Sequence, residues 1–161
     1  LAYGARRQAF GRTLWGLPLW RSTMADVVAE QIGFFMLAFE AVRSVDRADA
    51  GDEEAKKLGR LLIPMCKVLG GKLAVSTASE CMEAIGGNAY IEESILPRLL
   101  RDAQVLPIWE GTSNVLTLDC LRVIRKDAAQ TAFDVVIPEE DFPELIVRRP
   151  VRPHEPRGRE Q

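Results

Sequence analysis

The chain has 161 residues, of which 47% are hydrophobic and 27% charged, and its formal net charge is −2. This composition is that of an ordinary soluble protein with one sizeable core. The balanced charge gives no support to a nucleic-acid partner. The single histidine, His154, excludes a His-based catalytic triad and a His-rich metal site.

The cysteines and the apolar runs indicate the compartment. Cys66, Cys81 and Cys120 have no paired or metal-type spacing, so we interpret them as buried thiols in a reducing environment. No run of about 18 apolar residues occurs, and no charged-then-apolar leader opens the sequence. We therefore expect a cytoplasmic protein that has no membrane partner.

The first residues are typical of a helix end. Residues 1–11 resemble the last turns of a helix that Gly11 stops, with Arg6 and Arg7 near its C-terminal end. A connector over residues 11–18 follows. The first residues are therefore interpreted as the continuation of a helix.

Two long helices are predicted next. From Leu19 to about Asp49, apolar residues recur every three or four positions, which is one face of a helix roughly 45 Å long. We expect Trp20, Phe35 and Phe39 on that face to belong to the core. A second helix is predicted from Glu53 to about Ile85.

Proline and glycine residues indicate where the helices bend and end. Pro64 should kink the second helix, and Gly86-Gly87 should end it. Shorter helices are predicted over residues 92–102 and 112–126. The fold class is therefore all-α, of the up-down four-helix-bundle type, over residues 1–126. The Pro/Arg/Glu-rich tail, residues 127–161, is expected to be extended or disordered.

One turn combines a carboxylate with a helix start. Glu110 directly precedes Gly111, and then come Thr112, Ser113 and Asn114. These three residue types accept hydrogen bonds from free backbone N–H groups, and a helix start favours anions. A carboxylate held there can act on a substrate. The alternative is a capped turn with a solvated Glu110.

The stretch from Glu83 to Val115 strengthens the functional interpretation. It reads EAIGGNAYIEESILPRLLRDAQVLPIWEGTSNV, and it resembles the C-terminal signature of the acyl-CoA dehydrogenase family. A Gly-Gly-Asn segment, an Arg-Asp-Ala segment and a Glu-Gly-Thr segment follow in the family's order. The details are most similar to the branch that includes the bacterial alkylation-response proteins. The resemblance covers about residues 1–126. Because residues 1–11 correspond to the tail of a long helix in the family, it implies that the first helix is truncated here and that the chain is a fragment, or the remnant of a larger enzyme.

This resemblance implies a reaction. The family removes a proton from the carbon next to a thioester carbonyl and passes a hydride from the next carbon to the flavin of FAD. Glu110 occupies the position of the proton-abstracting base. A carboxylate suits that role where an apolar, water-poor pocket raises its pKa, and the neighbours Ile108 and Trp109 are apolar.

The resemblance also implies cofactor contacts. Positions that touch FAD in the family correspond here to Arg7, Phe10, Glu83, Gly86, Gly87, Thr112 and Asn114. In the family's Arg-x-x-Phe-Gly segment, which RRQAFG resembles, the Arg pairs with the pyrophosphate of a neighbouring subunit's flavin. Asn114 and Glu83 replace a more usual Gln, and a carboxylate beside a pyrophosphate is unfavourable. The alternatives are helix caps, and a cation near a helix end for Arg7.

Three functions remain open on the sequence. The first is the C-terminal domain of an FAD-dependent acyl-CoA dehydrogenase, inactive by itself, that acts on acyl-CoA in a dimer or tetramer, with electron-transfer flavoprotein as a possible electron acceptor. The second is a non-enzymatic helical module whose apolar groove binds a partner or a second copy. The third, DNA binding as in the alkylation-response branch, gains no support from the charge.

Overall fold

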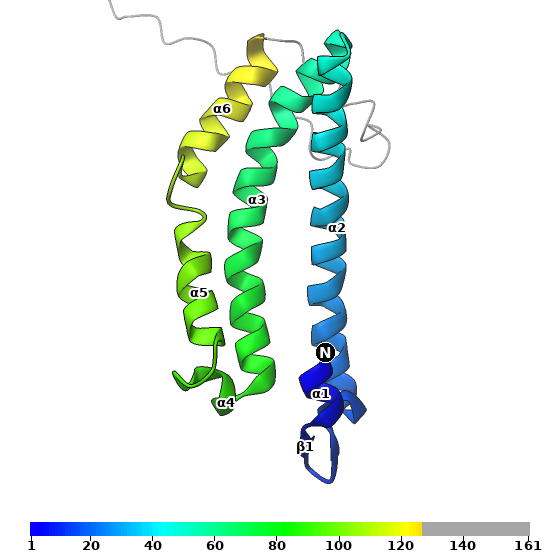
Figure 1. The fold of residues 1–161 in the computed structure, drawn as a ribbon, viewed down its shortest axis with the longest axis vertical. Coiled ribbons are helices and arrows are strands. Elements are labelled where there is room, and N and C mark those ends of the chain that lie inside the picture. Colours follow the sequence, from blue (N-terminus) through cyan, green and yellow to red (C-terminus); the bar gives the residue numbers. More distant parts are fainter. Residues whose placement is uncertain (127–161) are drawn as a thin grey trace, which may run out of the picture.

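The computed structural model describes residues 1–126, and they form an elongated bundle of helices (Figure 1). Two long helices, α2 (Pro18–Asp49) and α3 (Glu53–Ile85), run antiparallel. Two shorter helices, α5 (Leu96–Val105) and α6 (Ser113–Lys126), lie end to end along the other side of α3. The predicted all-α fold class is therefore confirmed. The predicted tail over residues 127–161 lies outside the described residues.

The N-terminal end is a short helix and a hairpin. Helix α1 (Ala2–Arg6) is followed by strands β1 (Gln8–Ala9) and β2 (Arg12–Thr13), which pair antiparallel, and by the 3₁₀ helix η1 (Leu14–Gly16). Phe10 and Gly11 both have positive φ, 53° and 77°, which suits a two-residue hairpin turn. The predicted helix to Gly11 is thus wrong, because this glycine serves the hairpin.

The core lies on both sides of α3. One cluster joins Ala41 of α2 to Leu58 and Leu62 of α3, and all three are buried. A second cluster joins Leu61 of α3 to Val123 of α6. Helix α3 therefore carries the central apolar contacts of the bundle, as the helix between its neighbours in Figure 1.

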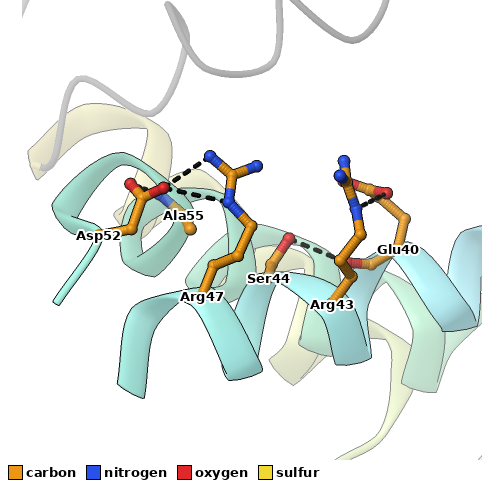
Figure 2. A network of polar contacts seen from close by, with 6 residues as sticks. All are labelled: Glu40, Arg43, Ser44, Arg47, Asp52 and Ala55. Atoms are coloured by element: carbon orange, nitrogen blue, oxygen red, sulfur yellow. Dashed lines mark hydrogen bonds and ion pairs between the residues drawn. The ribbon is translucent and has the colours of Figure 1, made fainter. Parts of the chain in front are cut away.

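The turn between the two long helices is fixed by polar contacts (Figure 2). The Asp52 carboxylate accepts the Ala55 backbone N–H at 3.0 Å and so caps the start of α3, and it also pairs with Arg47. These two contacts hold the pKa of Asp52 below its usual range. One turn earlier in α2, Arg43 pairs with Glu40 at 2.8 Å and lowers the pKa of that carboxyl.

Acid is expected to weaken this turn. The folded-state pKa of Asp52 is lowered, so its contribution is present above the ordinary aspartate pKa and is lost as the pH falls through the folded value. Asp52→Asn keeps a capping oxygen but removes the charge. In urea unfolding, we expect wild type to exceed Asp52→Asn in stability at pH 7, with the difference shrinking at pH 3. An equal difference at both pH values would contradict this account.

The helix boundaries mostly agree with the sequence. Helix α3 has the predicted bounds and contains Pro64, and Figure 1 shows it bent in its N-terminal part. The four-residue helix α4 (Gly87–Tyr90) was not predicted. Helix α5 starts at Leu96 rather than residue 92, and Pro97 lies in its first turn, where no backbone N–H is needed.

A stripe of α2 was wrongly assigned to the core. Phe35 and Phe39 are 58% and 59% exposed, although their ring centroids lie 4.4 Å apart. Ile32, three residues before Phe35, and Val42, three residues after Phe39, are similarly exposed. The reason is that the adjacent face of α2 packs on α3, and no described element covers this one. Trp20 is half-buried and donates its indole N–H to the Ala84 carbonyl at 2.8 Å.

By length and composition alone, α3 is the one helix among the described residues that could cross a membrane, and core helices of soluble proteins pass the same test. In Figure 1 it lies between α2 and the α5–α6 pair.

Candidate functional site

The predicted catalytic residue lies in the turn between α5 and α6. Ile108 and Trp109 both donate their backbone N–H groups to the Val105 carbonyl, at 2.9 and 3.1 Å. Glu110 and Gly111 follow with positive φ, 53° and 114°. Residues other than glycine rarely adopt this left-handed conformation, which costs roughly 1 kcal/mol or more. The turn therefore holds Glu110 in a strained backbone conformation.

Two residues of α3 hold this turn in place. The Lys67 ammonium donates to the carbonyls of Leu106 and Trp109, the latter at 3.1 Å. Gly71 lies under the turn, where an added Cβ would meet the Pro107 nitrogen at 3.2 Å. A neighbouring glycine, Gly70, makes similar room for the Phe34 ring of α2. The glycine pair thus lets both neighbours approach α3 closely.

A cavity of about 510 Å³ lies between α2, α3 and this turn. Its two charged lining residues are Glu110 and Lys67. The other lining residues are Gln31, Phe34, Cys66, Gly70, Gly71, Leu73, Ala74, Leu106 and Trp109. Burial raises the pKa of the Cys66 thiol. A mainly apolar cavity with one carboxylate at its wall can hold an apolar chain next to a base.

The expected water-poor setting of Glu110 is not found in the described residues. Glu110 is exposed, and its neighbours Ile108 and Trp109 are 63% and 54% exposed. No described element lies over this side of the turn. The apolar neighbours that the sequence predicted are present, but they are not covered.

The strain at Glu110 leads to a stability prediction. Glu110→Gly should raise the free energy of unfolding by up to about 1 kcal/mol, because glycine adopts positive φ without a Cβ penalty. Glu110→Ala is the matched control, since it also removes the carboxylate but keeps the Cβ. Chemical denaturation of both variants measures the difference. A Glu110→Gly protein no more stable than Glu110→Ala would show that the turn is unstrained.

The start of α6 carries two further predicted residues. Thr112 precedes the helix, and its backbone carbonyl accepts the Leu116 N–H at 3.0 Å. Thr112 and Asn114 are exposed. Within the part of the chain that the structure describes, neither side chain makes a hydrogen bond, so neither caps the helix. Both side chains therefore stay available to a ligand.

The other predicted cofactor residues belong to elements at the end of the bundle that carries α1, the hairpin and α4, whereas the Glu110 turn lies beside the middle of α3 (Figure 1). Tyr3 of α1 accepts a hydrogen bond from the Asn88 side-chain amide at 3.1 Å, and Gly4 lies against the Trp20 ring. These contacts place α1, which the hairpin directly follows, beside α4 and the start of α2. The structure therefore brings Arg7 and Phe10 to the same end of the bundle as Glu83, Gly86 and Gly87.

This bundle end presents accessible groups. Phe10 is 92% exposed at the hairpin tip, and Arg7 and Glu83 are exposed as well. A Cβ added to Gly86 or Gly87 would meet nothing within 4 Å. Gly86 also ends α3, with φ of 81° and its N–H donated to Met82. The positive φ explains why a glycine stands at position 86. Gly86 can both cap α3 and let a ligand approach the backbone.

The residues of the Glu110 turn and the predicted cofactor residues around Gly86 form two separate groups. Lys67, which holds the Glu110 turn, and Ile85, at the end of α3, are 18 residues apart in one helix. At 1.5 Å per residue, this is about 27 Å. The structure therefore does not bring Glu110 together with Gly86 and Gly87.

Sequence reasoning missed the residues that hold the Glu110 turn. Lys67 and Phe34 have no sequence signal, since each is one of many residues on a long helix. Gly70-Gly71 is not among the predicted site residues. A glycine pair in a helix interior is a usable signal, because it marks a close approach of another element.

Fold and site together define an all-α bundle domain with a carboxylate-bearing turn between its last two helices. Residues 1–124 match the family model described as acyl-CoA dehydrogenase, C-terminal domain. The chain therefore belongs to the acyl-CoA dehydrogenase family and corresponds to its C-terminal domain.

The similar proteins are longer than this chain. Acyl-CoA dehydrogenase family member 11 of Caenorhabditis elegans is 48% identical over 124 residues, 75% of this chain and 20% of the relative. The putative acyl-CoA dehydrogenase AidB of Escherichia coli is 35% identical over 149 residues, 89% of this chain and 27% of the relative. The crystal structure of Caenorhabditis elegans ACDH-11 in complex with C11-CoA superposes with a TM-score of 0.80 at 42% identity, covering 83% of this chain and 23% of that one.

Proposed function

We propose that this domain serves an FAD-dependent acyl-CoA dehydrogenase in which Glu110 is the proton-abstracting base. The observation that carries the proposal is the strained, left-handed Glu110 at the wall of a mainly apolar cavity. Strained residues of this kind persist where their surroundings fix them, and they gather at active sites. Family membership supports the same role for this position.

In this proposal Glu110 takes a proton from the carbon next to the thioester carbonyl. The carboxylate follows Trp109 directly, and the α3 contacts of the turn hold both residues at the cavity. The apolar lining would accommodate the acyl chain. The complex of the Caenorhabditis elegans relative with C11-CoA is consistent with a ligand that has such a chain. In a covered site, loss of water would favour the protonated base that the step forms.

FAD fits the exposed groups on this chain in part. Arg7 is an accessible planar cation for a pyrophosphate, Phe10 is an accessible ring, and Gly86-Gly87 is open backbone. Thr112 and Asn114 would hold the cofactor near Glu110. Glu83 does not fit, because a carboxylate repels phosphate. When bound, FAD supplies the acceptor for the hydride.

The separation of the two groups of residues favours a homo-oligomer. The groups lie about 27 Å apart along α3. We propose that two different FAD molecules are bound in a dimer or tetramer. One is held beside Glu110 by Thr112 and Asn114, and the other is held at the end of α3 by Arg7, Phe10 and Gly86-Gly87. Electron-transfer flavoprotein is the proposed acceptor of the electrons, and the cytoplasm is the proposed compartment.

A chimera tests this function. Residues 1–124 of this chain would replace the matched domain of the Caenorhabditis elegans relative. We expect a yellow protein whose flavin absorbance bleaches when C11-CoA is added without oxygen. A folded, flavin-containing chimera that is not reduced would refute the dehydrogenase role. A folded but colourless chimera would refute the cofactor contacts proposed for this domain.

The exposed stripe of α2 favours a second candidate, a non-enzymatic helical module. Val28, Ile32, Phe35, Phe39 and Val42 repeat at spacings of four and three, which is the pattern of a seam between helices. If the 161-residue chain self-associates and Phe35→Glu abolishes this without changing helix content, the stripe is an interface; the module is supported over the enzyme if the chimera is also inactive. A monomer at high concentration would exclude self-association as its role.

A further inference from the structure

Lys67 is the one charged residue of α3 that touches the Glu110 turn among the described hydrogen bonds. Its ammonium donates to the Leu106 and Trp109 carbonyls, which lie 39 and 42 residues further along the chain. Leu106 caps the C-terminal end of α5, where the helix dipole favours a cation. The half-buried Lys67 side chain thus crosses from α3 to the turn.

The two carbonyls that Lys67 holds lie shortly before the strained residue Glu110 in the sequence. Trp109 directly precedes Glu110, whose φ of 53° is unfavourable by itself. A strained residue keeps its conformation only if its neighbours fix the chain on both sides. On the C-terminal side, the Leu116 N–H fixes the Thr112 carbonyl at 3.0 Å. On the N-terminal side, Lys67 fixes the Trp109 carbonyl. Glu110 is therefore held between two anchored peptide groups.

We propose that Lys67 is a positioning residue for Glu110. Its charge-assisted hydrogen bonds hold the turn so that the Glu110 carboxylate stays at the cavity wall. The role proposed for Lys67 is to hold the turn, and the proton is taken by Glu110. The catalytic consequence rests on the proposed function of Glu110, whereas the ordering of the turn does not.

Hydrogen exchange on the 161-residue chain tests the ordering of the turn. Lys67→Met removes the ammonium and keeps an unbranched apolar side chain. We expect the Ile108 and Trp109 amides to exchange at least about tenfold faster, because one charged hydrogen bond contributes about that factor and the variant loses two. Lys67→Arg should restore slow exchange. Lys72→Met, an exposed lysine on the same helix, is the control and should change nothing.

The pattern of exchange in Lys67→Met distinguishes loss of order in the turn from general destabilisation. Unchanged exchange at Ile108 and Trp109 in Lys67→Met would overturn the proposal. Faster exchange across the whole chain, including the Gly51 amide in the distant α2–α3 turn, would overturn it too, because it would show general destabilisation. Faster exchange confined to the turn supports it, whether or not the domain proves to be enzymatic.

Turnover of the chimera tests the catalytic consequence. Per bound flavin, Lys67→Met should lower kcat about 100-fold with little change in KM, since a misplacement of about 1 Å costs a factor of this size. Lys67→Arg should recover most of the rate. Normal kcat in Lys67→Met, in a chimera whose parent is active, would overturn the positioning role. An inactive parent would instead count against the proposed function.

Discussion

Replacing Leu61 with alanine is expected to lower the free energy of unfolding by about 3 kcal/mol. Leu61 is 2% exposed and lies against Val123, so it joins the central helix α3 to α6. Truncation of such a residue loses apolar burial and leaves a cavity, at a typical cost of 2–5 kcal/mol. Urea unfolding followed by circular dichroism measures the change.

The control for this variant is Leu19→Ala. Leu19 is 85% exposed at the start of α2, so its truncation should change stability by less than about 0.5 kcal/mol. Similar losses in both variants would mean that α6 does not pack on α3 as described.

The second large effect concerns activity. In the chimera, Glu110→Gln should lower kcat by about 1,000-fold, within the 10²–10⁴ range of general acid–base catalysis. Gln has nearly the same shape and does not take up the proton. We expect flavin content and KM to change little, because the amide leaves the turn and the cavity intact.

Glu93→Gln is the control for this activity loss. Glu93 is exposed in the segment before α5 and lines no part of the cavity. Its variant should turn over as fast as the parent chimera. Equal losses in both variants would indicate a general charge effect, and full activity in Glu110→Gln would assign the base to another residue.

Much of the fold was predictable because its signals are local. The period of apolar residues predicted α3 with its observed bounds, and Ser113 starts α6 within one residue of the prediction. The hairpin at Phe10-Gly11 was missed, because two-residue strands carry no alternation. The exposure of Phe35 and Phe39 depends on which elements pack against α2, and a single helix pattern cannot show that.

The candidate site was predictable only as a motif. The Glu-Gly-Thr segment and its resemblance predicted the position of Glu110, and the structure adds its strained φ. Glu110 is separated from Gly86 because its turn lies beside the middle of α3 and Gly86 lies at its end. The length of this helix was predictable from the sequence. The Lys67 contacts needed the structure, because they join residues about 40 positions apart through backbone carbonyls that have no sequence signature.

The central claim is that Glu110 takes a proton from the carbon beside the thioester carbonyl. An acyl-CoA analogue with sulfur in place of the carbon that gives up hydride isolates this step. In deuterated water, the chimera should exchange the proton at that carbon, as mass spectrometry would show, and Glu110→Gln should abolish the exchange. Exchange at an unchanged rate in Glu110→Gln would contradict the account.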